Sequence, residues 1–488
     1  MQPSMIPRAG IAGIVSCAWM LPALLAFAAP AVGAQGDLHV IPHVKPRLIV
    51  LTDLSNEPDD EESLVRLLVY SDQFDIEGLV AVTSNWLKQN PREDLLRRDL
   101  DAYDQVRPNL VRHAPGFPPV ESMRAVTRSG QGAYGMAAVG PGRSSGGSRR
   151  IVEAVDLPDD RPIWVSIWGG PNTLAQALWD VRASRPPAEV EKFVAKLRVY
   201  AISDQDDAGA WIRREFPHLF YIVTPSNPAS YQEYYRATWT GISGGREVEA
   251  APGYHFALVD NPWLEANVIQ NHGPLGALYP RRLYLMEGDT PSFLGLIDHG
   301  LGWEISPAYG GWGGRYALYQ PAGETRPIWT DNASTCDRVE VEKDRFDSSN
   351  QATIWRWREH FQNDFAARMD WCVAGDFKKA NHNPRPVLNR DRSSGVVMIP
   401  AWSGSTVKLS AVGTDAGDEG QNVNVEWWIY HEAGTFEGAT LTQTSGPTTE
   451  VILPSGGSPG TVHVILQAED DGAPHLFAYR RVVLEVTP

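Results

Sequence analysis

Residues 48–62 read LIVLTDLSNEPDDEE, and this segment decides the fold class of the chain. Its apolar first half predicts a buried strand that ends at Asp53, and a helical pattern with Leu64, Leu67 and Leu68 follows the acidic loop. Carboxylates gathered at the end of a strand repel one another, so they stay ionised together only if a cation or hydrogen bonds compensate them. The segment therefore indicates a hard-metal site at a strand end of an α/β protein, where ligands usually bind.

Short β-branched runs alternate with helical patterns from residue 46 to about residue 300. This alternation predicts a mostly parallel sheet flanked by helices. The expected strands cover residues 47–54, 76–83, 163–167, 197–203 and 220–223. The expected helices cover residues 61–70, 93–106, 148–155, 171–183 and 187–196. We assign residues 46–380 to this α/β domain, with a core at 46–300 and an extension at 301–380.

Beyond residues 381–386, which read as a linker, the composition changes. Short alternating strands are expected at residues 406–412, 423–430, 449–453, 461–468 and 480–486. They predict an all-β, immunoglobulin-like sandwich over residues 385–488. Alternation places Trp427 on one face of its strand and Trp428 with Tyr430 on the other, so one face belongs to the core and the other to a domain interface.

The first 34 residues predict a secretory signal peptide and not a part of the fold. Arg8 precedes an apolar stretch at residues 11–29, and small residues at 31–34 form a cleavage site. No later run is long enough to span a bilayer. We therefore expect an exported protein, periplasmic or extracellular, that does not bind a membrane.

Charge and cysteine content restrict the partners of the chain. The formal net charge is -16, which disfavours nucleic acid as a partner and is compatible with cations and neutral substrates. Two cysteines remain after cleavage, Cys336 and Cys372. In an oxidising compartment we expect them to form a disulfide, and the alternative is a pair of buried thiols.

Two later segments also place polar groups where a strand gives way to a helix. WGGPNTLAQAL at residues 168–178 contains glycines that let the backbone approach a ligand, and its proline suits a helix start. EGDTPSF at residues 287–293 places Asp289 after an apolar run at 283–286 that reads as a strand. The alternative is that the acidic residues only cap helices and that residues 168–171 form an ordinary tight turn.

These three segments, in this order, resemble the nucleoside hydrolase fold. That family has an Asp-rich first loop closed by Asp-Asp, a later Gly-Pro-x-Thr-Asn turn and a final strand ending in His-Asp-Pro. The chain is more closely similar to secreted nucleoside hydrolase-like proteins of the DUF1593 type, which are often labelled cellulose-binding and end in an immunoglobulin-like domain. The resemblance covers about residues 46–486 and is carried by EPDD at 57–60, WGGPNTLA at 168–175, HGPLG at 272–276 and GDTPS at 288–292.

The resemblance implies a Ca²⁺ ion at the top of the sheet. Asp60 matches the second residue of the Asp-Asp pair, a metal ligand, and Asp289 matches the ligand in His-Asp-Pro. The main-chain oxygen of Gly169 matches a further ligand, and Asp53 matches one of the two earlier aspartates of the loop. Asp59 matches the aspartate that contacts a sugar hydroxyl.

The identity of the general base depends on the alignment of the first loop. Read without a gap, Asp53 matches the earlier aspartate, and Ser55 stands where the family has its base. A shifted loop makes Asp53 the base, and both alignments remain open. Gly288 stands where nucleoside hydrolases carry a histidine that serves the leaving base in some members, which argues against a purine or pyrimidine leaving group.

We therefore expect a Ca²⁺-dependent hydrolase that cleaves a glycosidic bond in an oligo- or polysaccharide. The cation activates a water and Asp53 takes its proton. Asp59, which contacts a sugar hydroxyl, is the second candidate catalytic residue. An acid for the leaving oxygen is sought among Glu57, Asp206, Asp207 and His272. The candidate substrate-binding residues are Asn85, Trp168, Asn172, Asp204, Asp207, His272 and Trp312.

Each of these candidates also has a structural interpretation. Residues 204–207 are also consistent with a solvated acidic loop, His272 with a structural histidine, and Trp312 with a core residue. Two other functions are retained as alternatives: a non-catalytic carbohydrate-binding protein and a ribonucleoside N-glycosidase.

Overall fold

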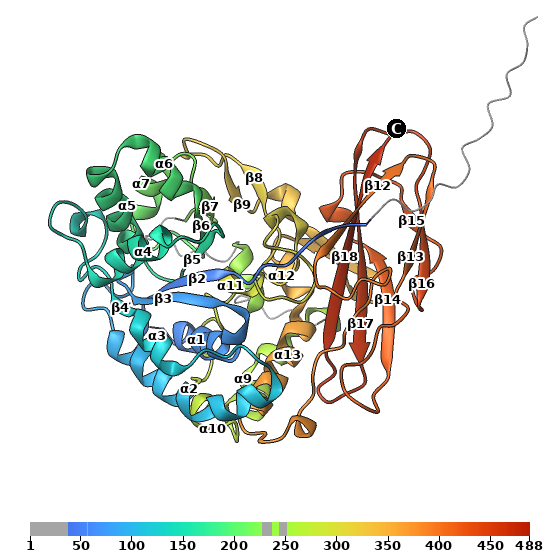
Figure 1. Ribbon diagram of the computed structural model, residues 1–488, viewed down its shortest axis with the longest axis horizontal. Coiled ribbons are helices and arrows are strands. Elements are labelled where there is room, and N and C mark those ends of the chain that lie inside the picture. Colours follow the sequence, from blue (N-terminus) through green and yellow to red (C-terminus); the bar gives the residue numbers. More distant parts are fainter. Residues whose placement is uncertain (1–37, 56, 227–236, 244–250) are drawn as a thin grey trace, which may run out of the picture. The chain divides into compact units, whose positions relative to one another are not determined.

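An eight-stranded sheet forms the centre of the α/β domain in the computed structural model, which describes residues 38–55, 57–226, 237–243 and 251–488 (Figure 1). The expected signal peptide lies outside the described residues. Neighbouring strands are parallel except for the last pair, in which β8 runs antiparallel to β9. The strand order is β4 (Thr127–Ser129), β3 (Asp75–Ala81), β2 (Arg47–Thr52), β5 (Ile163–Ile167), β6 (Leu197–Ala201), β7 (Phe220–Ile222), β9 (Ile328–Thr330) and β8 (Ala317–Tyr319).

Helices cover both faces of this sheet, because its central strands are apolar on both sides. In β2, Leu48 and Val50 belong to one hydrophobic core, and Ile49 and Leu51 belong to the other. The first core receives α1 (Asp59–Val69), α2 (Glu93–His113), α3 (Val120–Val126) and α13 (Arg358–Trp371). The second receives α4 (Gly146–Asp156), α5 (Asn172–Ser184), α6 (Pro187–Ala195) and α7 (Ala208–Glu215). The expected mostly parallel sheet flanked by helices is confirmed.

One expected strand is absent from the described residues. The run at 283–286 forms no strand, because Asn261 holds the preceding turn through hydrogen bonds to the backbone N and O of Arg282, at 2.9 and 3.1 Å. Leu283 and Tyr284 are 72% and 67% exposed. The prediction of a strand before Asp289 was therefore wrong, and Asp289 comes from an irregular loop before the short helix α11 (Pro291–Leu294).

The C-terminal part is a sandwich of a five-stranded and a three-stranded sheet. The larger sheet has the order β1 (His39–Ile41), β12 (Val396–Trp402), β18 (Phe477–Thr487), β17 (Gly460–Asp470) and β14 (Val423–Ile429). The smaller has the order β13 (Thr406–Ser410), β16 (Thr448–Ile452) and β15 (Thr440–Leu441). Because β1 pairs with β12, the described chain begins in the sandwich before it enters the α/β domain. The sequence analysis did not identify β1 or β12.

The strand β14 joins the two domains through one of its faces, as alternation predicts. Trp427 is buried in the sandwich core. Trp428 lies against Trp357 of the α/β domain, with ring centroids 5.7 Å apart, and the Tyr430 hydroxyl donates a hydrogen bond to Asp337.

The segment at residues 381–386, which its composition predicts as a linker, connects the two domains and is packed. Asn381 and His382 are buried. The Asn381 side chain donates to Asp470 of β17, at 3.1 Å, and the His382 ring stacks on Phe377. The connection between the domains is therefore held on both sides.

The expected disulfide is also absent, since Cys336 and Cys372 are both free thiols. Cys372 is buried directly after α13, where its thiol donates to the carbonyl of Arg368 and its own carbonyl accepts from Asn109. Cys336 precedes β10 (Asp337–Glu342), which pairs only with the hairpin partner β11 (Arg345–Ser349) among the described strands.

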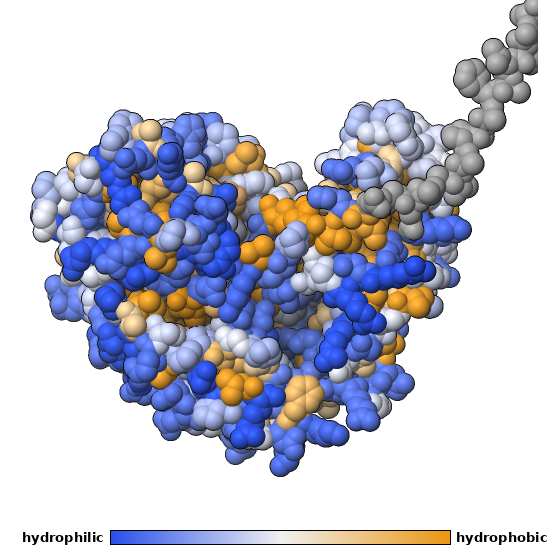
Figure 2. Space-filling model, in the orientation of Figure 1, coloured by the Kyte–Doolittle hydropathy of each residue, from blue (hydrophilic) through white to orange (hydrophobic). Residues whose placement is uncertain are grey.

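Polar and charged side chains cover most of the face drawn in Figure 2, and apolar side chains form smaller patches on it. Among the described residues, no helix combines the length and apolar character that a membrane crossing requires.

We predict that Gly300→Ala destabilises the junction of the two domains. A Cβ atom at Gly300 would lie 1.9 Å from the carbonyl oxygen of Tyr479 in β18, and the residue has φ +91°. Gly323 has the same φ and no heavy atom within 4 Å of an added Cβ, so Gly323→Ala is the matched control. The left-handed backbone lowers the free energy of unfolding of both variants by about 1–2 kcal/mol. Overpacking lowers that of Gly300→Ala by about 1–3 kcal/mol more. Equal losses in urea unfolding would contradict this account of the junction.

Candidate functional site

The parallel register brings the predicted site segments to one edge of the sheet. Leu51 pairs with Ile167, and Ile167 pairs with Ala201, so β2, β5 and β6 end at the same level. Asp53 follows the first of these strands, and residues 168–170 follow the second. The carboxyl ends of the central strands therefore form the floor of the candidate site.

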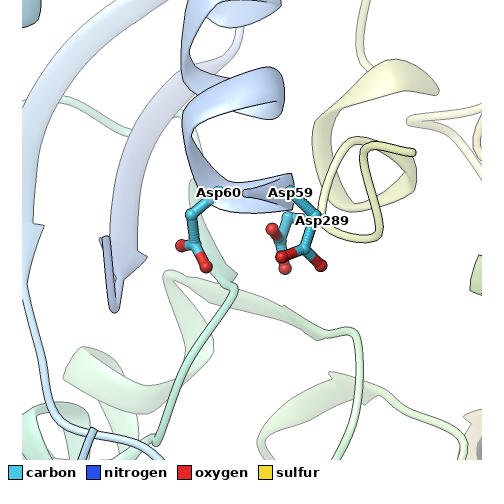
Figure 3. A group of neighbouring side chains, drawn as sticks. All are labelled: Asp59, Asp60 and Asp289. Atoms are coloured by element: carbon cyan, nitrogen blue, oxygen red, sulfur yellow. The ribbon is translucent and has the colours of Figure 1, made fainter. Parts of the chain in front are cut away.

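Three carboxylates converge above this floor. Oxygen atoms of Asp59, Asp60 and Asp289 all lie within 4.8 Å of one another. Figure 3 shows Asp59 and Asp60 on the first turn of α1 and Asp289 on the loop before α11, with the carboxylates directed into a common space. We call these three residues the carboxylate cluster. It unites Asp60 and Asp289, which the resemblance predicts as ligands, with Asp59, which it predicts as a sugar contact.

The cluster has more acceptor oxygens than donors to satisfy them. Asp60 Oδ1 accepts from the Thr52 hydroxyl and from the backbone N of Asp53, the latter at 3.2 Å. Asp59 Oδ1, Asp289 Oδ2 and Asp53 Oδ1 are buried without a hydrogen-bond partner among the described residues. Buried polar atoms normally have partners, and the three residues of the cluster form a group of oxygens that could hold a metal ion.

Helix capping does not account for these carboxylates. Pro58 is the N-cap of α1 and Thr290 is the N-cap of α11, and neither helix has a side-chain cap. The alternative in which Asp59, Asp60 or Asp289 serves as a cap therefore does not describe the structure.

Glycines at the rim are required by the close approach of the acidic side chains. An added Cβ would lie 2.5 Å from Asp53 Oδ1 at Gly169 and 2.5 Å from Asp206 Oδ2 at Gly170. These contacts explain the Gly-Gly sequence, which is therefore more than an ordinary turn.

Gly288 is constrained by the same kind of contact. A Cβ there would lie 2.7 Å from Asp59 Oδ2 and 3.1 Å from the ring of Trp239. The sequence analysis did not identify Trp239, which lies in a region without a recognisable motif. A larger side chain at position 288 would displace Asp59 or Trp239.

Burial and mutual repulsion shift the acidity of the whole group. Burial raises the pKa of Asp53 to about 6. Burial and the charge of Asp53 raise the pKa of Asp59 to about 7. Burial and the charges of Asp59 and Asp53 raise the pKa of Glu57 to about 8. Burial and the neighbouring carboxylates raise the pKa of Asp60 and of Asp289 well above the usual range.

A buried ion pair holds the loop that carries Asp289. The carboxylate of Glu287 accepts from Arg66 through both oxygens and from the Tyr279 hydroxyl at 2.8 Å. The backbone N of Glu287 donates to Glu62 at 2.7 Å. Glu287 has φ 52°, a left-handed conformation that these bonds hold in place.

This network fixes the distance between α1 and the loop, and thereby between the two sources of the cluster. The sequence analysis missed it. A signal was present, because Arg66 is the one charged residue in the apolar run at 64–69, LVRLLV, and a buried charge requires a partner.

The predicted residues that follow β3 and β5 have hydrogen-bond partners within the protein. Trp168 is buried, and its indole N–H donates to Ser166 at 2.8 Å. Asn172 donates to the carbonyl of Ala133 at 2.8 Å. Asn85 is half-buried and accepts from Lys88 at 2.8 Å.

The two predicted aspartates after β6 have structural partners. Asp204 is buried in an ion pair with Arg213, with distances of 2.7 and 2.9 Å. Asp207 is exposed and accepts from the backbone N of Met136 at 2.7 Å. No described contact joins either one to the carboxylate cluster.

His272 and Trp312 make their described contacts outside the carboxylate cluster. His272 lies directly before the short helix α10 (Gly273–Gly276), which packs on α13. Its Nε2 lies 3.2 Å from Oδ1 of Asp370. Trp312 is buried between His299 and Tyr479 at the junction with the sandwich. There it lines a cavity of about 480 Å³, and no described contact joins it to the carboxylate cluster.

Comparison with known proteins gives consistent matches for both parts of the chain. Residues 47–316 match a family model described as "Cellulose-binding Sde182, nucleoside hydrolase-like domain". Residues 406–486 match "Cellulose-binding protein Sde0182, C-terminal domain". The comparison with curated proteins returned no match.

Among solved structures, the chain is similar to a nucleoside hydrolase-related hypothetical protein from Saccharophagus degradans that is associated with carbohydrate metabolism. The sequences are 36% identical, the match covers 91% of this chain and 100% of that one, and the TM-score is 0.78. The effector protein XOO4466 is 11% identical, with a TM-score of 0.31, and the match covers 94% of that protein and 64% of this chain. The type III effector XopQ is 12% identical, with a TM-score of 0.30, and the match covers 96% of that protein and 68% of this chain. These last two are too distant to support an argument.

We predict that the protein without divalent cations loses stability as pH rises from about 5 to 8. The folded pKa values of Asp53, Asp59 and Glu57 lie above the ordinary values of unfolded chains. The folded state therefore binds more protons in this window, and its free energy of unfolding falls as they leave.

In thermal melts with chelator, Asp289→Asn should reduce this loss by about 1 kcal/mol or more, because it removes one buried carboxyl group that keeps its proton only in the folded state. Asp104→Asn, at an exposed acidic position on α2, is the control and should follow the wild type. Parallel pH profiles for all three proteins would show that the cluster is not under electrostatic strain.

Proposed function

Since the chain belongs to the family of cellulose-binding, nucleoside hydrolase-like proteins represented by Sde182, we propose that it is an exported, Ca²⁺-dependent hydrolase of glycosidic bonds in an oligo- or polysaccharide. One observation carries the proposal. The carboxylate cluster lies at the carboxyl edge of the sheet with buried oxygens that lack partners.

The donor set fits a hard cation. Asp59, Asp60 and Asp289 offer only oxygen atoms, within 4.8 Å of one another, and Ca²⁺ takes oxygen ligands. In our proposal Asp60 and Asp289 hold the ion, and Asp53 and the main-chain oxygen of Gly169 complete the set. The close packing of Gly169 on Asp53 supports the inclusion of this pair.

A cation bound there would supply positive charge that acidifies a nearby water and orients the hydroxyl groups of a sugar ring. Asp53 would accept the proton of the attacking water through Oδ1, which has no protein donor among the described residues. The water oxygen would bond to the anomeric carbon while the bond to the leaving oxygen breaks. Asp59 would accept a hydrogen bond from a sugar hydroxyl.

The leaving oxygen needs a proton, and we assign Glu57 to supply it. Of the four candidates, Glu57 is half-buried, its charge raises the pKa of Asp60 and Asp289, and the charge of Asp53 raises its own pKa. His272 and Asp207 have partners outside the cluster. Asp206 accepts from the backbone N of Ala208, at 2.7 Å, and so has a structural role.

A carbohydrate substrate follows from the family and from Gly288. The matching models describe cellulose-binding proteins, and the similar protein from Saccharophagus degradans is described as associated with carbohydrate metabolism. The crowding of Gly288 by Asp59 and Trp239 leaves no room for the histidine that serves a nucleobase. Export places the protein where such substrates occur.

A second candidate is a carbohydrate-binding protein without catalysis. The family description favours it, because both matching models are described as cellulose-binding. In that protein the cation and the carboxylate cluster would only hold sugar hydroxyls.

We predict that calorimetry detects one Ca²⁺ site per chain. Asp60→Asn and Asp289→Asn each weaken it by more than about 100-fold, beyond the effect typical of outer partners. Asp104→Asn should bind as the wild type does. Unchanged affinity in both cluster variants would remove the metal assignment, and so would a folded wild type without binding.

We predict that the wild type releases reducing ends from at least one member of a panel of plant and bacterial polysaccharides. Loss of the base in Asp53→Asn should lower the rate about 10²–10⁴-fold. Binding to polysaccharides without turnover across the panel would favour the non-catalytic candidate. Release of free base from inosine or uridine would support a nucleosidase instead.

A further inference from the structure

A second cavity, of about 480 Å³, lies between the α/β domain and the sandwich. Its lining includes the end of α13, residues 297–299, 382–387 and 392–394, and the start of β18, and it includes no member of the carboxylate cluster. Its volume is in the range of small-molecule sites, which often occur at domain interfaces.

One wall of this cavity is a fixed aromatic stack. Phe377 lies on the His382 ring with centroids 3.6 Å apart and planes at 5°, and His382 stacks in turn on Trp371 and His113. Phe377 retains 38% exposure, so it offers an aromatic surface to a ligand. Such surfaces bind the C–H edges of sugar rings.

Hydrogen bonds hold this wall in place before any ligand arrives. His113 Nδ1 lies 3.0 Å from His382 Nε2, and His113 Nε2 lies 2.8 Å from the carbonyl oxygen of Ala374. His382 Nδ1 lies 3.0 Å from the Asp418 carboxylate of the sandwich. The stack is therefore anchored in both domains, which reduces the entropic cost of binding.

Most charges in the cavity are already paired. Asp72 and Asp364 accept from Arg368, at 2.7 and 3.3 Å. Arg480 pairs with Asp391. Asp298 accepts from Ser394 at 2.7 Å.

Two arginines remain without a partner. Arg385 and Arg392 line the cavity and are exposed, and neither side chain has an ion pair or a hydrogen bond to any described residue. The chain carries 59 acidic and 43 basic residues. An excess of basic residues therefore does not explain why two arginines of one cavity lack acidic partners. Guanidinium groups bind carboxylates through two parallel hydrogen bonds.

We propose that this cavity binds a sugar unit that carries a carboxylate, a uronic acid residue of an oligosaccharide. Arg385 and Arg392 bind the carboxylate, and the ring stacks on Phe377. The site is separate from the carboxylate cluster, so this binding proposal does not depend on the proposed hydrolysis.

The test is calorimetry on the full mature chain with a trimer of galacturonic acid and with a neutral trimer of glucose. The acidic trimer should bind the wild type, and Arg385→Gln and Arg392→Gln should each weaken binding by about tenfold or more. Phe377→Ala should also weaken it. Arg390→Gln changes an exposed arginine of the same segment that does not line the cavity, so it should bind as the wild type does.

A further variant separates the two sites. Asp289→Asn should leave binding of the acidic trimer unchanged, whatever it does to Ca²⁺ binding or turnover. Equal binding of the neutral trimer, no binding of the acidic trimer, or binding that is insensitive to both Arg385→Gln and Arg392→Gln would each overturn the proposal. A melting temperature equal to that of the wild type confirms that each variant is folded.

Discussion

Mutual repulsion among buried carboxylates is the constraint on which the site depends. Asp53, Asp59, Asp60 and Asp289 occupy one small volume, and burial disfavours the ionised form of each. Without a compensating charge, the fold resolves this conflict by retaining protons. The cation of our proposal would resolve it differently, because oxygen–metal contacts would replace the repulsion. The same feature that costs stability without a cation would then favour its binding.

The surrounding structure shows how the chain maintains so unfavourable an arrangement. Glycines at positions 169, 170 and 288 admit carboxylate oxygens at distances that no side chain would allow. The Arg66–Glu287 ion pair fixes the loop of Asp289 against the helix of Asp59 and Asp60, and both partners are fully buried. The site therefore rests on rigid elements on both sides, as precise ligand placement requires.

The sequence predicted those features that depend on local pattern. The apolar runs at 47–54 and 163–167 predicted the central strands, and the strings at 57–60 and 288–292 predicted residues of the cluster. Long-range contacts were not accessible in this way. The apolar run at 283–286 has a strand-like composition, yet Asn261 holds the turn before it. The segment 381–386 has a linker-like composition, yet His382 is held by an aromatic stack.

Other differences have the same origin. Trp312 stands in Gly-rich sequence typical of a binding loop, but β18 of the sandwich covers it. Cys336 and Cys372 were expected to pair in an oxidising compartment, whereas the fold leaves both as free thiols. The junction between the domains, which contains both Trp312 and the second cavity, is the part of the molecule that sequence pattern described least well.

The central claim is that the carboxylate cluster is a cation site, and crystallography with Ca²⁺ present tests it most directly. Our account predicts one anomalous difference peak at about 2.3–2.6 Å from oxygens of Asp60 and Asp289. A crystal grown at saturating Ca²⁺ that shows no peak there, with the carboxylates bonded to one another through shared protons, would contradict it.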